Sequence, residues 1–297
     1  MVLKERVAVV TGAGSGLGRA HAMLLANHGA RVVVNDMNIE SASRVADEIV
    51  GNGGQAIAIA ASVTDEAQVA AMIDRVIASW QRVDILINNA GILRDKSFAK
   101  MSLDDFRLVL DVHLMGAVIC TKAVWEIMRQ QNYGRIVMTT SSSGLYGNFG
   151  QSNYGAAKMA VVGLMQTLAI EGEKYNVRVN CLAPTAATQM TQGVLSKEAL
   201  AKLDPKLVSP GLLALVGDDA PTRAILCAGA GHFARAYVTL TKGCRIGGDV
   251  DAGERVMKQW DRISDPTEEI VPAYGFKQAE LELASAGCEA PTVAESR

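Results

Sequence analysis

Short apolar runs alternate along the chain with longer stretches in which apolar residues recur every three or four positions. The short runs predict strands buried on both faces, at residues 6–10, 31–36, 55–61, 83–87, 135–140, 177–181 and 223–229. The periodic stretches predict helices at residues 17–28, 40–50, 65–80, 103–131, 153–175, 196–203 and 249–263. Alternating strands and helices favour parallel strands joined by right-handed crossovers. The expected class is therefore α/β: a Rossmann-like, doubly wound, mostly seven-stranded parallel sheet with helices on both faces.

The strand–helix alternation weakens towards the C-terminus, and this change predicts the domain organisation. Residues 1–242 are expected to form one domain, which includes a loop at 186–210 placed to shape a substrate pocket. Residues 243–297 are expected to form a C-terminal extension that is partly helical or extended. Its last part, residues 264–297, is polar and poorly periodic, which is typical of an extended arm or a disordered tail.

The composition narrows the range of partners. Lys and Arg number 29 against 31 Asp and Glu, so neither a nucleic acid nor an anionic membrane surface is an expected partner. No apolar run suggests a membrane span, and Val2-Leu-Lys-Glu-Arg leads directly into a strand, which leaves no room for a signal peptide. The five cysteines are scattered, so no metal site is expected. The last residues, Glu-Ser-Arg, are not a Ser-Lys-Leu peroxisomal address, and we expect a cytoplasmic protein.

A glycine-rich turn joins the first strand to the first helix. Its residues are Thr11-Gly12-Ala-Gly-Ser15-Gly16-Leu17-Gly18. Glycines let backbone N–H groups approach a pyrophosphate, and a helix N-terminus attracts negative charge. A turn of this kind is weak evidence alone, because many tight turns are rich in glycine. In this position it predicts a dinucleotide site made by Gly12, Ser15, Gly16, Leu17 and Gly18.

Asp36 ends the second strand, where a carboxylate is placed to accept hydrogen bonds from an adenosine ribose. The same charge would repel a 2′-phosphate, so NAD is favoured over NADP. The alternative is an Asp that only caps the following helix. Two further stretches lie where a bound cofactor would reach. In the first, Ser62 and Val63 could contact the adenine. Asn89, Ala90 and Gly91 either line the cofactor cleft or are ordinary turn residues.

Tyr154 and Lys158 are four residues apart on a predicted helix and therefore lie on one face. A neighbouring cation favours the phenolate and lowers the pKa of tyrosine from its usual value of about 10, which would make Tyr154 an acid or base near neutrality. Any helix can carry such a pair by chance. The preceding strand, however, delivers Ser141 to the same edge of the sheet as the glycine-rich turn.

Taken in order and at their spacings, these motifs resemble the short-chain dehydrogenase/reductase family over about residues 5–240. They are Thr11-Gly-x-x-x-Gly-x-Gly, Asn88-Asn-Ala-Gly, Ser141 and Tyr154-x-x-x-Lys158. The resemblance implies that Tyr154 is the general acid/base, that Lys158 lowers its pKa and holds the nicotinamide ribose, and that Ser141 binds the substrate oxygen. The spacing of 13 residues to Tyr154 selects Ser141 over Ser142 and Ser143. The Pro-x-x-x-Thr turn implies that Pro184 and Thr188 hold the carboxamide.

A narrower resemblance is to the (3R)-hydroxyacyl-CoA dehydrogenase units of peroxisomal multifunctional enzymes type 2 and their bacterial stand-alone relatives. Its motifs are Gly91-Ile-Leu-Arg-Asp-Lys-Ser-Phe98, Val112-His-Leu-x-Gly116, Gly147-Asn-Phe-Gly-Gln-x-Asn-Tyr154 and Met190-Thr-Gln192. It implies oxidation of a (3R)-3-hydroxyacyl-CoA to the 3-ketoacyl-CoA with NAD, in a homodimer or homotetramer. Two features differ: the glycine-rich insertion after Asp36 is missing, and no hydratase or sterol-carrier domain follows.

Two other functions stay open from the sequence. One is the same chemistry on a hydroxysteroid or another bulky secondary alcohol, because the loop 186–210 sets the pocket. The other is a catalytically silent NAD-binding regulator, which the intact set of Ser141, Tyr154 and Lys158 argues against. His113 lies where most of the family has an Asn that helps to hold a water, and a structural role for it is at least as plausible as proton transfer.

Overall fold

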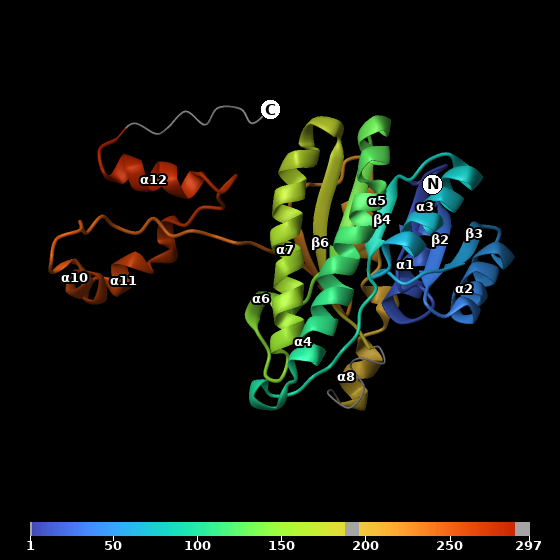
Figure 1. Ribbon diagram of the computed structural model, residues 1–297, viewed down its shortest axis with the longest axis horizontal. Helices are drawn as coiled ribbons and strands as arrows, with labels where there is room; N and C mark the ends of the chain where they lie inside the picture. Colours follow the sequence, from blue (N-terminus) through green and yellow to red (C-terminus); the bar gives the residue numbers. More distant parts are fainter. Residues whose placement is uncertain (1, 188–195, 289–297) are drawn as a thin grey trace. The chain divides into compact units, whose positions relative to one another are not determined.

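A single sheet of eight strands organises the computed structural model, which describes residues 2–187 and 196–288. The strand order is β3-β2-β1-β4-β5-β6-β7-β8, with β1 to β7 parallel and β8 antiparallel to β7. The strands are β1 (Val7–Val10), β2 (Arg31–Asp36), β3 (Gln55–Ala60), β4 (Ile85–Asn88), β5 (Gly134–Thr139), β6 (Val177–Thr185), β7 (Ile225–Gly229) and β8 (His232–Ala236). The predicted Rossmann-like class is confirmed (Figure 1).

Helices cover both faces of the sheet. On one face, α3 (Glu66–Trp80), α5 (Gly116–Gln131) and α7 (Ser152–Gly172) pack in one apolar core (Figure 1). On the other face, α1 (Gly16–Asn27), α2 (Ile39–Gly51) and α9 (Pro210–Val216) pack in a second core. Adjacent residues of β1 alternate between these cores, because successive side chains of a strand point to opposite faces: Val7 and Val9 belong to the first, Ala8 and Val10 to the second.

The eighth strand was missed by the sequence analysis. Ala230 and Gly231 both have positive φ, 51° and 76°, and they form a two-residue turn that folds β8 back onto β7. All of β8 is at least partly exposed, so its sequence His-Phe-Ala-Arg-Ala lacks the apolar run that identified the buried strands. It covers the edge of the sheet that a seventh strand would otherwise have left open.

The long helix expected at residues 103–131 is one continuous helical run with an interruption. It comprises α4 (Leu103–Leu110), a π-helical turn η2 (Asp111–Met115) and α5. Leu103–Gln131 is also the one described run long and apolar enough to cross a membrane. Its Ala117, Cys120, Val124 and Met128 lie in the first core, and a core helix passes the same test, so the run is not strong evidence for a membrane span.

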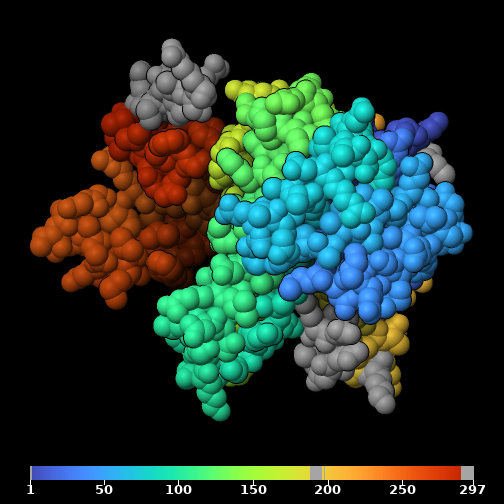
Figure 2. Space-filling view, turned by 45° about the vertical axis from the view of Figure 1, so that its right-hand side comes forward, coloured from blue at the N-terminus to red at the C-terminus, as the bar shows by residue number. Residues whose placement is uncertain are grey.

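The chain divides into two compact units, Met1–Ala236 and Tyr237–Arg297. Figure 2 shows one face of the first unit, built largely by residues coloured blue to green. The described part of the second unit holds α10 (Ala252–Lys258), α11 (Trp260–Ile263), η6 (Pro266–Glu268) and α12 (Lys277–Ser285). The helix expected at residues 249–263 is thus two short helices, and α12 lies where an arm or a disordered tail was expected. No residue of the described part, 237–288, is buried, which explains why α12 has no apolar periodicity.

Three short helices complete the first unit around the carboxyl ends of the strands. They are α6 (Ser142–Tyr146) after β5, the turn η1 (Phe98–Lys100) after β4, and α8 (Lys197–Lys202) after β6. The turn η3 (Glu173–Tyr175) ends the α7 run, and η5 (Pro205–Leu207) precedes α9. The strand order reverses between β1 and β4, and at such a switch point the loops leave in opposite directions and open a crevice for a ligand.

Candidate active site

The glycine-rich turn between β1 and α1 is held against the end of β4. Gly12 has a φ of +62°, and a Cβ there would lie 2.9 Å from Ala90 Cα. A Cβ on Gly18, in the first turn of α1, would lie 2.2 Å from the carbonyl oxygen of Gly12. The turn therefore passes close to two backbones, and its N–H groups and the start of α1 form a cradle that fits a pyrophosphate. Ser15, Gly16 and Leu17 form the turn's end and the first residues of α1.

Asp36 lies beside this turn, at the carboxyl end of β2. Its Oδ2 accepts a hydrogen bond from the N–H of Gly14 (3.0 Å), and its Oδ1 accepts one from the N–H of Asn38 (3.0 Å). The carboxylate is thus fixed at the edge of the cradle, where a ribose would lie. It is not the cap of α2, because Asn38 fills that position and accepts from Ser41 N–H. The alternative assignment as a helix cap is therefore wrong.

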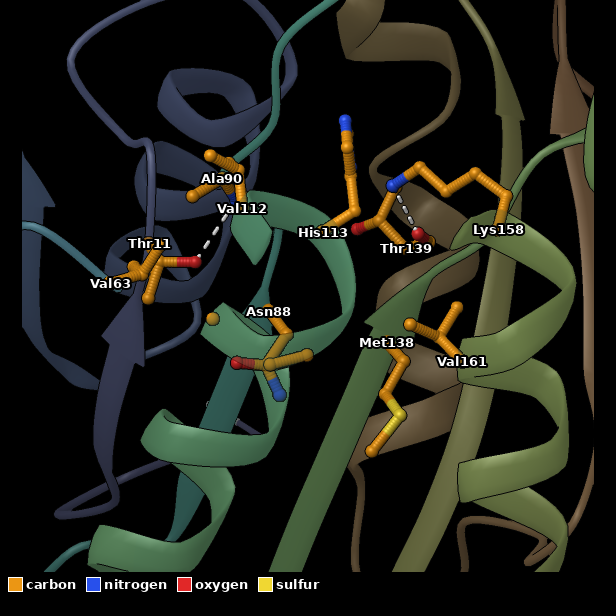
Figure 3. A pocket seen from close by; sticks show the side chains of 12 residues that line it. Thr11, Val63, Asn88, Ala90, Val112, His113, Met138, Thr139, Lys158 and Val161 are labelled. Carbon is orange, nitrogen blue, oxygen red and sulfur yellow. Dashed lines mark hydrogen bonds between the residues drawn. The ribbon is translucent and has the colours of Figure 1, made fainter. Parts of the chain in front are cut away.

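The amides after β4 have separate roles. Asn89 Nδ2 donates to the carbonyl oxygens of Thr11 (2.9 Å) and Gly12 (3.1 Å), so its side chain ties β4 to the glycine-rich turn. Ala90 N–H donates to Thr11 Oγ1 (3.0 Å), the dashed contact at the left of Figure 3. Asn88 points the other way and donates to Thr121 Oγ1 (3.1 Å). The loop that follows β4 therefore borders the cradle with Asn89, Ala90 and Gly91. The Asn89 side chain fixes this loop to the glycine-rich turn.

The remaining predicted cofactor residues are placed at the ends of β3 and β6. Val63 is buried and lines a cavity with Thr11 and Ala90 (Figure 3), while Ser62 next to it hydrogen-bonds Thr64 through its hydroxyl. Pro184 lies in β6 opposite Ala228 of β7. Thr188 lies outside the described residues. Among the described residues, no group of three or more His, Cys, Asp or Glu could hold a metal ion.

The structure brings Ser141, Tyr154 and Lys158 together at the same edge of the sheet. Ser141 follows β5 and Tyr154 and Lys158 lie on α7, which packs beside it. The Ser141 side chain lies beside the Tyr154 phenol, close enough to act on the pKa of that group. Lys158 Nζ lies 5.5 Å from the centre of the Tyr154 ring. It donates to the carbonyl oxygen of Thr139 (2.6 Å), a contact drawn as a dashed line in Figure 3. The i, i+4 spacing thus places the phenol and the ammonium side by side.

Burial dominates the electrostatics of this pair. Lys158 is only 3% exposed, and desolvation of its ammonium lowers its pKa to about 7. Desolvation also raises the pKa of Tyr154; the hydrogen bond from Ser141 opposes this and the charge of Asp95 adds to it. The pKa of Tyr154 is therefore raised, whereas the spacing to Lys158 alone predicts a lowered one. The difference arises because burial takes both groups out of water, and desolvation opposes the charged form of each.

His113 packs against Tyr154, edge to face, with ring centres 5.2 Å apart. The π-helical turn η2 carries it, and its Nε2 lies 2.7 Å from the carbonyl oxygen of Ile92. A Cβ on Gly91 would lie 2.2 Å from the imidazole Cε1, so glycine is required there. Burial, and then the charge of Lys158, lower the pKa of His113 to about 3, so the ring is neutral at physiological pH. It is therefore a packing partner of the Tyr154 ring.

A small polar cavity lies between His113 and Lys158 (Figure 3). Its volume is about 10 Å³, roughly the space that one water needs. Three buried atoms around it have no hydrogen-bond partner among the described residues: Asn88 Oδ1, His113 Nδ1 and Thr139 Oγ1. Buried polar atoms are normally satisfied, so the cavity suits an ordered water beside the lysine.

The fold and the site together define a class of protein. The family model "short chain dehydrogenase" matches residues 6–199, and the chain belongs to the short-chain dehydrogenase/reductase family of enzymes. This makes it an oxidoreductase, and members of the family generally use NAD or NADP. The residues matched by the family model include the glycine-rich turn, the loop after β4, Ser141 and the Tyr154–Lys158 pair.

Among the relatives, the chain is 45% identical over 273 residues to peroxisomal multifunctional enzyme type 2 of Drosophila melanogaster, covering 88% of this chain and 45% of that enzyme. The solved full-length structure of the Drosophila enzyme superimposes with a TM-score of 0.81 at 38% identity, over 96% of this chain and 50% of that chain. The chain thus spans about half the length of this relative.

Two relatives are matched over most of their own length. A protein of Mycobacterium tuberculosis, named as a short-chain type dehydrogenase/reductase, is 43% identical over 273 residues, 89% of this chain and 95% of that protein. A structure of 7α-hydroxysteroid dehydrogenase, complexed with NADH and 7-oxo glycochenodeoxycholic acid, superimposes with a TM-score of 0.72 at 31% identity, over 77% of this chain and 94% of that chain.

Proposed function

We propose that this chain is an NAD-dependent dehydrogenase that interconverts a (3R)-3-hydroxyacyl-CoA and a 3-ketoacyl-CoA. The observation that carries the oxidoreductase chemistry is the juxtaposition of Ser141, Tyr154 and Lys158 beside the glycine-rich cradle. The acyl-CoA substrate is supported by the 45% identity to a peroxisomal multifunctional enzyme type 2. The acidic side chain of Asp36 at the edge of the cradle supports NAD.

The residues divide the work of the reaction. The Ser141 hydroxyl binds the substrate oxygen and orients it towards Tyr154. The Tyr154 oxygen accepts the hydroxyl proton when the alcohol is oxidised and returns a proton when the ketone is reduced. Lys158, held by Thr139, lies beside the phenol and stabilises its anionic form whenever the amine is protonated. Bound NAD would supply the hydride acceptor, and the cradle, Asp36 and Lys158 are the groups placed to hold it.

The substrate class is tested by assaying NAD reduction with (3R)-3-hydroxyacyl-CoAs of several chain lengths, their (3S) epimers, and hydroxysteroids. Turnover of the (3R) thioesters well above that of the (3S) epimers is the expected result. A preference for steroids would instead favour the second candidate, a hydroxysteroid dehydrogenase, which the likeness to 7α-hydroxysteroid dehydrogenase supports. Tight NAD binding with no turnover of any alcohol would indicate a silent NAD-binding regulator.

Asp36→Ala is expected to weaken the preference for NAD over NADP. The change removes a charge-assisted hydrogen bond to the ribose and a repulsion of the 2′-phosphate, so we expect the difference in binding free energy to shrink by about 1–3 kcal/mol. Titrating both cofactors into both proteins measures it. Asp47→Ala, an exposed carboxylate on α2, is the matched control. Equal affinity of the unmodified protein for the two cofactors would contradict the assignment.

We also propose a homodimer or homotetramer. Apolar side chains remain about half exposed on neighbouring helices: Met159 (40%) and Ile170 (46%) on α7, with Leu108 (41%) on α4. Such side chains gain from being covered by another copy. Sedimentation velocity at micromolar protein concentration is expected to give a species larger than the 31.4 kDa chain, and a monomer would contradict the proposal. The cytoplasmic location stays a prediction from the sequence.

A further inference from the structure

Two loops at the mouth of the site are tied together by hydrogen bonds. The first follows β4 and the second precedes α7. Lys96 N–H donates to the carbonyl oxygen of Gly150 (2.9 Å), and Asn153 Nδ2 donates to that of Arg94 (3.1 Å). Between these contacts, the Gln151 amide donates through Nε2 to Asp95 Oδ2 (2.6 Å). The segment that leads into the Tyr154 helix is therefore held by the segment that leaves the cofactor cleft.

The Gln151 side chain can face only one way in this arrangement. A carboxylate accepts hydrogen bonds and donates none, so Asp95 requires the –NH₂ end of the amide. The Oε1 end then faces Ser143 and Asn148, and it accepts from Ser143 Oγ (2.8 Å) and Asn148 Nδ2 (3.0 Å). The carboxylate thus determines which atom of Gln151 meets Ser143.

From Ser143 the contacts continue to the catalytic serine. The N–H of Ser143 donates to Ser141 Oγ (3.2 Å), which occupies a lone pair of that oxygen. The single proton of Ser141 and its second lone pair are then free, one for Tyr154 and the other for the substrate oxygen. A path of contacts therefore runs from the surface carboxylate of Asp95, through the side chains of Gln151 and Ser143, and then through the backbone N–H of Ser143 to Ser141 Oγ beside Tyr154.

The charge of Asp95 has an electrostatic cost for the proposed reaction. It opposes the phenolate of Tyr154, so it raises the pKa of that group and works against alcohol oxidation. An apolar group in its place would remove this penalty but would leave the Gln151 amide without an acceptor. The neighbouring charges have other partners, since Lys96 and Arg94 both lie against Asp105 (3.0 and 3.8 Å).

We propose that Asp95 and Gln151 are positioning residues: through Ser143 they hold Ser141 in the orientation in which its hydroxyl bonds Tyr154 and the substrate oxygen. Neither residue touches the reacting atoms. The inference rests on the proposed function, because it assigns these residues a role in the same reaction.

The kinetic test compares Gln151→Ala, Asp95→Ala, Asp95→Asn and Asp104→Asn. Misplacing a catalytic group costs up to about 10²-fold, so Gln151→Ala and Asp95→Ala are expected to lose roughly 10- to 100-fold in kcat. KM for NAD should stay within about twofold, because the cradle is untouched. Asp95→Asn keeps an oxygen that can accept from Gln151 and should recover much of the loss of Asp95→Ala. Asp104, 93% exposed on α4, is the matched control and its change should have no effect.

A spectroscopic test does not depend on finding the substrate. The phenolate of Tyr154 is titrated by ultraviolet absorbance, taking the difference between each variant and the same variant carrying Tyr154→Phe. Gln151→Ala should raise the midpoint, because Ser141 then loses the orientation that stabilises the phenolate. Asp95→Asn should lower it, by less than about one pH unit, because solvent screens an exposed charge. Circular dichroism checks that each variant is folded.

The expected result is a raised phenolate midpoint in Gln151→Ala and a lowered one in Asp95→Asn, together with the losses in kcat of Gln151→Ala and Asp95→Ala. Folded Gln151→Ala and Asp95→Ala proteins with unchanged kcat and an unchanged phenolate midpoint would overturn the inference while leaving the proposed function intact. A wild-type protein that turns over no alcohol would contradict the proposed function alone, and the titration would still decide whether Gln151 and Asp95 act on the Ser141–Tyr154 pair.

Discussion

Tyr154→Phe is expected to reduce kcat by about 10²–10⁴-fold, the usual contribution of a general acid/base. The change removes one hydroxyl and hardly alters the volume, so the ring should keep its edge-to-face contact with His113 and the fold should be retained. Binding of NAD should be nearly unchanged, because the cradle and Asp36 lie on other elements. Steady-state kinetics on the best (3R)-3-hydroxyacyl-CoA, with calorimetry for NAD, measure both quantities.

Tyr146→Phe is the matched control, because that phenol is 71% exposed on α6. It should retain wild-type turnover. If Tyr154→Phe retains most of its activity on every alcohol that the wild-type protein oxidises, Tyr154 is not the acid/base and another group must move the proton.

Lys158→Met is expected to abolish turnover and to stabilise the folded protein at neutral pH. Turnover should fall because the ammonium no longer supports the phenolate, and NAD should bind more weakly if Lys158 holds its ribose. Stability should rise because burial makes the charged form of Lys158 unfavourable, as its pKa of about 7 shows. Lys158→Met also loses the hydrogen bond to Thr139. With that loss included, we expect the free energy of unfolding to increase by about 1–3 kcal/mol.

The gain should depend on pH in a defined direction. Lysine in an unfolded chain has a pKa of about 10.4, so between about pH 7 and that value the unfolded state binds more protons than the folded one. Wild-type stability therefore rises with pH across this window, and the Lys158→Met protein lacks that contribution. Thermal melts should show the largest advantage of the variant at or below about pH 7, fading towards pH 10. A variant less stable than wild type throughout would contradict the assigned cost of burial.

The core of the fold and most of the candidate site could be predicted because they depend on local patterns. The buried strands needed unbroken apolar runs, and the pair Tyr154–Lys158 needed only the 3.6-residue repeat of a helix. The position of Asp36 beside the glycine-rich turn followed from the parallel order of β1 and β2. In each case a residue's neighbours in space are determined by its neighbours in sequence and by the direction of the strands.

The parts that could not be predicted depend on contacts between distant segments or on solvent. β8 has no apolar run, because at an exposed edge its side chains need not be buried. Asp95 and Gln151 meet across 56 positions of sequence, and no periodicity links them. The pKa of Tyr154 is raised by burial, and the residues of a sequence motif do not indicate how deeply a side chain is buried.

The π-helical turn at Asp111–Met115 determines where the side chain of His113 lies. In it the N–H of Gly116 bonds the carbonyl oxygen of Asp111, five residues back, so the turn accommodates one residue more than an α-helix would. The extra residue is contained in this one wide turn, so α4 and α5 continue as one helical run while His113, within the turn, faces the Tyr154 ring. Removing one residue from this turn would let the run close as a regular α-helix, and we expect His113 then to lose its place against the Tyr154 ring while the two flanking helices are retained.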